Sequence, residues 1–255
     1  MDPVIRIFQS PAELAEEFAS DIVSGIMAAF HKERHFTIAL SGGTTPKTLF
    51  SVLAEEFNGS IPWKNVHFFW GDERCVTPEN QQSNYKMAKQ YLLDKINIPQ
   101  TNIHRILGEN DPGKESDRYA HEIKDFVKLR NGIPSFDLIM LGMGLDGHIA
   151  SIFPDQPALL KSDKVCEVSV HPVTMQKRIT LTGKVLNNAA VLAFMVTGKS
   201  KAFLVSEILS KAKEADYYPA AHIAPENGKL EWLLDKESSI FLGDETIRAD
   251  RLNIN

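Results

Sequence analysis

Short apolar runs, each followed by a loop and a helix-like pattern, recur along this sequence and constrain its fold more than any other feature. The runs lie at residues 36–40, 66–70, 138–141 and 189–196. The last two are apolar without alternation, as parallel strands are when helices cover both faces of the sheet. The repeated order of strand, loop and helix predicts an α/β fold, a mostly parallel sheet flanked by helices on both faces in a Rossmann-like three-layer arrangement.

Apolar residues spaced by three or four positions predict the helices. We expect helices at residues 11–31, from 45 to just before 59, at 83–95, at 116–130 and at 199–211. The first has Ser10 as a suitable N-cap and Pro11 at the first helical position. Segments 109–115 and 213–227 have the composition of loops but not of domain linkers. We therefore expect a single domain over residues 1–255, with or without a small subsidiary lobe.

The charge balance argues against one large class of proteins. The chain has 28 basic and 33 acidic side chains and a formal net charge of -5. A general nucleic-acid binder needs a surplus of Lys and Arg to displace counterions from phosphates. Any anionic ligand of this chain must therefore be held by a local basic cluster.

Cysteine usage and the lack of targeting patterns favour a cytoplasmic protein. Cys75 and Cys166 lie far apart and have no Cys-x-x-Cys pair or His run for zinc, which fits a reducing compartment. The first residues lack the basic start and apolar core of a secretion signal. The longest apolar-looking stretch, at 184–199, is too short and too polar to cross a bilayer. We expect neither a secreted nor a membrane protein.

The loop after the first apolar run is a candidate phosphate cradle, with the sequence Ser41-Gly42-Gly43-Thr44-Thr45-Pro46. Its two glycines allow a sharp turn, and several N–H groups and hydroxyls converge at a helix N-terminus, where the helix dipole adds partial positive charge. Thr45 and Pro46 suit the N-cap and first turn of that helix. The loop lacks the Gly-Lys-Ser/Thr ending of a nucleotide-binding loop, which favours a small sugar phosphate over ATP. A glycine turn that serves only geometry is the alternative.

Two further clusters place charged side chains near the ends of apolar runs. In Gly-Asp-Glu-Arg at 71–74, Arg74 can form a two-pronged contact with phosphate or carboxylate, and Asp72 can hold a hydroxyl or orient a catalytic group. Arg178 and Lys199 add positive charge, the lysine at a later strand-to-helix junction. The alternatives are a solvated turn at 71–74 and simple helix capping near Lys199.

Residues 142–154 carry the most informative pattern, Gly-Met-Gly-Leu-Asp-Gly-His-Ile-Ala-Ser-Ile-Phe-Pro. Gly-x-Gly-x-x-Gly matches a dinucleotide fingerprint, but Pro154 cuts short the helix that this motif needs, which favours close approach to a small ligand over nicotinamide binding. His148 lies among glycines, two residues from Asp146, where both groups can face one cleft. Because imidazole exchanges protons near neutral pH, we interpret His148 as catalytic.

Taken in their order along the chain, these four segments resemble the 6-phosphogluconolactonase family, within the larger group of glucosamine-6-phosphate isomerase-like sugar-phosphate proteins. The resemblance extends over almost the whole chain, from the loop at 41–46 to Ala-Ala-His-Ile at 220–223. Isomerases of this group carry a Glu just before the proline, in an Asn-Glu-Pro sequence, and this Glu works with the His in opening the sugar ring. Here that position is Phe153. Its apolar ring cannot shuttle a proton, so the lactonase activity is favoured.

The resemblance implies hydrolysis of 6-phospho-D-glucono-1,5-lactone to 6-phospho-D-gluconate, the second step of the oxidative pentose phosphate pathway. The implied partner is this small sugar-phosphate lactone, with no nucleic acid, membrane, metal or cofactor, and the implied assembly is a monomer or small homo-oligomer. The candidate site residues are His148 and Asp146 for catalysis and Ser41, Gly42, Gly43, Thr44, Thr45, Asp72, Arg74, Arg178 and Lys199 for substrate binding.

Our hypothesis for the chemistry is general-base catalysis on a lactone whose 6-phosphate is held by the backbone of residues 41–45 with Arg74, Arg178 and Lys199. His148 takes a proton from the attacking water, and N–H groups of the loop at 142–147 are candidates for stabilising the carbonyl oxygen. Asp146 either orients His148 or holds a ring hydroxyl. The absence of Gly-x-Ser-x-Gly argues against a covalent serine intermediate. A sugar-phosphate isomerase or deaminase, a non-catalytic sugar-phosphate-binding protein and a nicotinamide dehydrogenase remain as alternatives.

Overall fold

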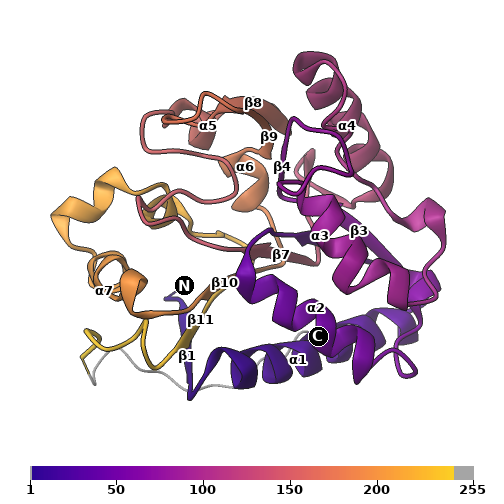
Figure 1. Cartoon of the computed structure of the whole chain (residues 1–255), viewed down its shortest axis with the longest axis horizontal. Helices are drawn as coiled ribbons and strands as arrows, with labels where there is room; N and C mark the ends of the chain where they lie inside the picture. The colour runs from indigo at the N-terminus through magenta and orange to yellow at the C-terminus, as the bar shows by residue number, and fades with distance from the viewer. Residues whose placement is uncertain (1, 244–255) are drawn as a thin grey trace.

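A six-stranded sheet forms the centre of the structure, a computed structural model that describes residues 2–243 (Figure 1). The strand order is β1-β11-β10-β7-β2-β3, and every neighbouring pair is parallel. The strands are β1 (Val4–Phe8), β2 (Phe36–Leu40), β3 (Val66–Trp70), β7 (Leu138–Leu141), β10 (Val191–Val196) and β11 (Lys229–Asp235). The predicted α/β class with a mostly parallel sheet is confirmed.

Helices cover the sheet from both sides. Figure 1 shows α1 (Pro11–His31) and α2 (Thr44–Glu55) along one side of it. On the other side lies α4 (Pro112–Phe126), whose Tyr119 ring centroid is 6.4 Å from that of Phe69 in β3. The remaining α-helices are α3 (Asn84–Tyr91), α5 (Ala158–Lys161), α6 (Gly183–Leu186) and α7 (Ala202–Leu209). None of the helices within residues 2–243 combines the length and the apolarity that crossing a membrane requires.

Four strands, β2, β3, β7 and β10, are buried at every position. This agrees with the absence of polar alternation in their sequences, because both faces of each strand are covered. The buried Thr37 of β2 and His67 of β3 are hydrogen-bonded. Thr37 donates to Asp137 at 3.0 Å, and the rings of His67 and His104 share a bond of 2.8 Å between Nδ1 and Nε2. Buried polar groups with such partners do not carry the cost of lost hydration.

A second, antiparallel sheet was not predicted. Its order is β4-β9-β8, with β4 (Asp72–Arg74), β8 (Cys166–Val170) and β9 (Lys177–Leu181). In Figure 1 it lies with α4, α5 and α6 above the large sheet, as a small lobe. A two-stranded hairpin, β5 (Leu129–Arg130) and β6 (Ile133–Pro134), completes the strands of the described chain.

Several predicted helix boundaries were wrong. The helix predicted at 116–130 begins at Pro112, because the Asp111 side chain accepts a hydrogen bond from the N–H of Lys114 at 3.1 Å, so part of the predicted loop at 109–115 is helical. It ends at Phe126, before the chain enters the β5–β6 hairpin. The helix predicted at 11–31 has the predicted bounds, whereas three others are shorter than predicted, because α2 ends at Glu55, α3 ends at Tyr91 and α7 begins at Ala202.

One carboxyl group inside the large sheet is only partly satisfied. Glu231 of β11 is 1% exposed, and its Oε2 accepts no hydrogen bond from the residues that the structure describes. Burial raises the pKa of Glu231 from 4.5 to about 7, although the charge of Arg6 acts in the opposite direction. Between these two pH values the folded protein binds a proton that the unfolded chain has released. Stability therefore falls as the pH rises from 4.5 to 7.

Glu231→Gln removes this buried charge and keeps the shape of the side chain. We expect the variant to be more stable than the unaltered protein at pH 8, by about 1–3 kcal/mol, because each unit of pKa shift corresponds to about 1.4 kcal/mol. The gain should vanish near pH 4.5, where the native carboxyl is already protonated. Urea unfolding at both pH values measures this, with the exposed Glu226→Gln as control. A variant that is less stable at pH 8 would contradict the assignment.

Candidate active site

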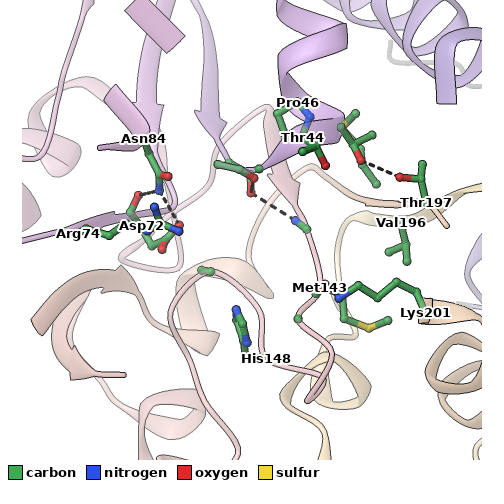
Figure 2. Close-up of a pocket in the computed structure, with 18 of the residues that line it drawn as sticks. Thr44, Pro46, Asp72, Arg74, Asn84, Met143, His148, Val196, Thr197 and Lys201 are labelled. Carbon is green, nitrogen blue, oxygen red and sulfur yellow. Dashed lines mark hydrogen bonds between the residues drawn. The ribbon is translucent and has the colours of Figure 1, made fainter. Parts of the chain in front are cut away.

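The loops that follow β2, β7 and β10, together with β4, surround a pocket of about 300 Å³ (Figure 2). They meet because parallel strands end at the same edge of a sheet. The pocket is lined by nine of the predicted site residues, namely Ser41, Gly42, Gly43, Thr44, Thr45, Asp72, Arg74, His148 and Arg178. Two other predicted residues, Asp146 and Lys199, do not line it.

The loop after β2 ends in an uncapped helix N-terminus. Gly43 is the N-cap of α2, and its φ of +113° lies in the region that favours glycine. The prediction of Thr45 as N-cap was wrong, since no side chain caps α2. Thr45 instead forms a hydrogen bond of 2.9 Å with Thr197, which follows β10, between their Oγ1 atoms. An N-terminus whose first N–H groups lack side-chain partners is suited to bind an anion.

Two lysines follow β10, and only the second reaches the pocket. Lys199, which was predicted to bind substrate, is exposed and lies outside it, whereas Lys201 lines it. The chain turns at Gly198, whose φ is +91°, and winds into a 3-10 helix, Lys199–Lys201, that carries the later lysine to the inner side. Lys201 Nζ donates to the carbonyl oxygen of Met143 at 2.7 Å, and burial lowers the pKa of this lysine.

His148 and Asp146 form a hydrogen-bonded pair. Nδ1–H of His148 donates to Oδ1 of Asp146 at 2.6 Å, and the backbone N–H of His148 donates to the same oxygen at 3.2 Å. Gly144 permits this turn, because a Cβ there would lie 2.1 Å from Nδ1 of His148. Asp146 therefore acts through the imidazole. Nε2 of His148 makes no hydrogen bond within residues 2–243 and is the ring nitrogen that can exchange a proton.

Asp146 is ionised at neutral pH. Burial acts to raise the pKa of its carboxyl, but the hydrogen bond and charge of His148 outweigh this and lower the pKa to about 2. An ionised acceptor at Nδ1 fixes the tautomer of the ring and stabilises the imidazolium that forms when Nε2 takes up a proton.

Two arginines stand side by side at the pocket. Arg74 and Arg178 are opposite each other in the β4–β9 ladder, and the Nε of each is buried without a partner in the described chain. Burial, together with the charge of Arg74, lowers the pKa of Arg178. Neither arginine, nor Lys201, forms an ion pair with a carboxylate between residues 2 and 243. These cations are therefore available to an anionic ligand.

Asp72 is held by its neighbours. Its Oδ2 accepts from Ser151 Oγ at 2.6 Å, and its backbone oxygen accepts from Nδ2 of Asn84 at 2.9 Å. Ser151 is fully buried and also accepts from Nη1 of Arg178 at 3.4 Å. This carboxylate therefore belongs to a network that fixes the arginine.

Phe153 contacts both His148 and Arg178. It is fully buried, its ring centroid is 4.8 Å from that of His148, and Cζ of Arg178 is 5.5 Å from the same centroid. Arg178 therefore lies on the His148 side of the pocket. The position before the proline, which carries Glu in isomerases, contributes only an apolar ring here.

Three polar or charged side chains that line the pocket were absent from the predicted set, namely Asn84, Thr197 and Lys201. Asn84 follows the N-cap of α3, and Thr197 follows β10 directly. Both are therefore polar residues at a helix start or a strand end, where site residues are expected in this fold. The choice of Lys201 over Lys199 depends on the 3-10 turn after Gly198, which no sequence pattern indicates.

Replacing His148 by Ala removes the side-chain hydrogen bond and the charge that do most to lower the pKa of Asp146, while burial and the weaker backbone hydrogen bonds remain. We expect the carboxyl of Asp146 to titrate near pH 2 in the unaltered protein and at a clearly higher pH in His148→Ala. The chemical shift of the Asp146 carboxyl carbon in a pH titration measures this. The control is His121→Ala, whose ring is exposed on α4. Equal midpoints in all three proteins would show that the pair does not form.

Comparisons with known proteins show which family the chain belongs to. The family model described as glucosamine-6-phosphate isomerases/6-phosphogluconolactonase matches residues 9–232. A 6-phosphogluconolactonase of Haemophilus influenzae is 45% identical over 200 residues, 78% of this chain and 84% of that protein. One of Aggregatibacter actinomycetemcomitans is 40% identical over 236 residues, 92% and 98% of the two chains. The solved structure of 6-phosphogluconolactonase from Trypanosoma brucei matches with a TM-score of 0.85 and 30% identity, covering 95% of this chain and 99% of that one. The chain belongs to the family of glucosamine-6-phosphate isomerases and 6-phosphogluconolactonases.

Proposed function

We propose that this chain hydrolyses 6-phospho-D-glucono-1,5-lactone to 6-phospho-D-gluconate, the second step of the oxidative pentose phosphate pathway. The observation that carries the proposal is the Asp146–His148 pair, whose imidazole lines a pocket that also contains an uncapped helix N-terminus and unpaired cations. A substrate with a phosphate at one end and an electrophilic carbon at the other fits this arrangement. The relatives named above carry the name of this enzyme.

The phosphate binds at the N-terminus of α2. Gly43, Thr44 and Thr45 present backbone N–H groups and hydroxyls there, and Lys201 supplies a positive charge. Figure 2 shows Thr44, Thr197 and Lys201 on one side of the pocket and Arg74 on the other. A phosphate held at the first side fixes how far the lactone ring extends towards the second.

His148 is the general base. Nε2 takes a proton from a water molecule as the water oxygen attacks C1 of the lactone. The bond between C1 and the ring oxygen then breaks, and His148 returns the proton to that oxygen, which becomes a hydroxyl group. Asp146 holds Nδ1 throughout. General-base assistance contributes about 10²–10⁴-fold, which together with positioning suffices for an ester as reactive as a lactone.

The arginines act at the lactone end. Arg178 and His148 both contact the ring of Phe153, so the guanidinium of Arg178 lies near the base. This differs from the sequence hypothesis, which grouped Arg74 and Arg178 with the phosphate. Negative charge develops on the carbonyl oxygen as water attacks, and buried donors without other partners stabilise it.

The backbone of the histidine loop is less suited to this task than the sequence suggested. The N–H of Gly142 donates to Ser41 Oγ at 3.4 Å, that of Gly144 to the carbonyl of His148 at 2.8 Å, and that of Gly147 to the carbonyl of Gly144 at 3.2 Å. These three donors therefore hold the loop itself, and we assign the charged oxygen to the arginines.

Phe153 favours hydrolysis over the isomerase or deaminase activity of the same family. Its buried ring offers no proton to a sugar ring oxygen at the position where isomerases carry Glu. We expect no ammonia release from glucosamine 6-phosphate under conditions in which the lactone is consumed.

The setting that we infer is the cytosol. Both cysteines are free, and burial raises the pKa of each thiol, that of Cys75 to about 11, which fits inert thiols in a reducing compartment. We also propose that the chain acts as a monomer or a small homo-oligomer. The reaction as written needs only side chains and water.

His148→Ala removes the base but leaves the phosphate contacts in place. We expect kcat to fall by about 10²–10⁴-fold, with KM nearly unchanged. Proton release at constant pH, corrected for spontaneous hydrolysis, measures the rate. His121→Ala should behave like the unaltered protein. Hydrolysis by His148→Ala at the unaltered rate would refute the assignment of the base.

Lys201→Met removes the charge that we place beside the phosphate. We expect KM to rise by about tenfold or more with a smaller change in kcat, because this contact is made equally in the ground and transition states. Lys199→Met is the matched control and should leave both constants unchanged, since this side chain lies outside the pocket. A larger effect from Lys199→Met would reverse the assignment of the two lysines.

A further inference from the structure

Glu73, the residue between Asp72 and Arg74, does not line the pocket but holds the residues around it. It is 2% exposed, and its carboxylate accepts four hydrogen bonds. Oε1 accepts from the N–H of Arg74 at 2.8 Å and of Asn84 at 2.8 Å. Oε2 accepts from Ser83 Oγ at 3.0 Å and from the N–H of Tyr85 at 2.8 Å. Three of the partners are backbone N–H groups, which can only donate, and an ionised carboxylate accepts from all four, although burial raises the pKa of Glu73.

These bonds join β4 to the beginning of α3. Ser83 is the N-cap of α3, and Asn84 and Tyr85 are its first residues, so Glu73 occupies the place of a buried second cap. Charge-assisted bonds to backbone N–H groups at a helix N-terminus are among the stronger hydrogen bonds in proteins. The strand and the helix start therefore move together.

Both joined segments carry pocket side chains. Asn84 donates to the backbone oxygen of Asp72 (Figure 2), and a Cβ on Gly42 would lie only 2.1 Å from its Oδ1. The guanidinium of Arg74 donates from Nη1 to the backbone oxygen of Gln82, just before α3, at 2.5 Å. The position of Arg74 and the packing of Asn84 on the phosphate loop thus both depend on where α3 begins.

We propose that Glu73 is a positioning residue for the hydrolysis, which sets the placement of Arg74 at the lactone end of the pocket, and the packing of Asn84 against Gly42, through its four hydrogen bonds. The inference rests on the proposed function. It assigns a role to the one charged residue of Gly-Asp-Glu-Arg that the proposed chemistry does not otherwise use. Because the phosphate contacts of Lys201 and α2 lie on the other side, the loss of Glu73 should affect the chemical step more than phosphate binding.

Glu73→Gln is the direct test. Its amide keeps the size of the side chain but turns an NH₂ group towards two of the four donors. We expect kcat for the lactone to fall by about 10–100-fold, the effect of small misplacements at a reacting centre. The inhibition constant of inorganic phosphate as a competitor should change by less than about twofold, because the contacts of the phosphate with Lys201 and the start of α2 are retained.

Two further variants guard against a purely structural explanation. Ser83→Ala removes one of the four bonds and should show the same pattern with a smaller loss of kcat. Asp137→Asn is the matched control, since Asp137 accepts from the N–H and hydroxyl of Thr37 at 2.9 and 3.0 Å, at the start of β2 rather than at its pocket end. It should lower Tm without changing kcat.

Three results would overturn the proposal. The first is an unaltered kcat in Glu73→Gln, whatever its Tm. The second is a weakening of phosphate inhibition by the same factor as the fall in kcat. The third, for the case that Glu73→Gln does not fold, is an unaltered kcat in Ser83→Ala. Lactone hydrolysis by the unaltered chain is measured in the same assay. Its absence would count against the proposed function, whereas its presence with an unaffected variant counts against Glu73 alone.

Discussion

Parallel pairing of β2, β7 and β10 places the ends of these three strands at one edge of the sheet, and every feature of the candidate site depends on that arrangement. The uncapped start of α2 follows β2, the His148 loop follows β7, and Lys201 follows β10. Residues from sequence positions up to 160 apart thereby surround a single pocket. Because these strands are buried at every position, they form a rigid support, and the loops that follow them carry the reactive side chains.

The site concentrates positive charge in a chain whose formal net charge is -5. Arg105 and Arg118, which do not line this pocket, are each bonded to glutamates, whereas Arg74, Arg178 and Lys201 have no carboxylate partner within residues 2–243. The unpaired cations fall into two groups on opposite sides of His148. A phosphate and a developing oxyanion are the two negative charges that lactone hydrolysis brings to such a pocket.

The sequence predicts the centre of the fold better than its periphery, for physical reasons. Strands β2 and β3 and helix α1 occupy the predicted residues, because buried strands are uniformly apolar and α1 carries a full apolar stripe and its own cap. Strands β4 and β9 were not predicted, since β4 has three charged residues and pairs with a strand about a hundred positions later. The loops of the site could be located from glycines at strand ends. The choice of Lys201, the uncapped Gly43 and the role of Glu73 depend on backbone turns and distant partners that no local pattern encodes.

The most direct test of the account is a crystal structure with 6-phospho-D-gluconate bound, since the product carries both charges that the two sides of the pocket are assigned to hold. The account places the phosphate against the N–H groups of Gly43 to Thr45 and Nζ of Lys201, with the C1 carboxylate beside Nε2 of His148 and the guanidinium of Arg178. A phosphate lodged between Arg74 and Arg178, with C1 out of reach of His148, would contradict it.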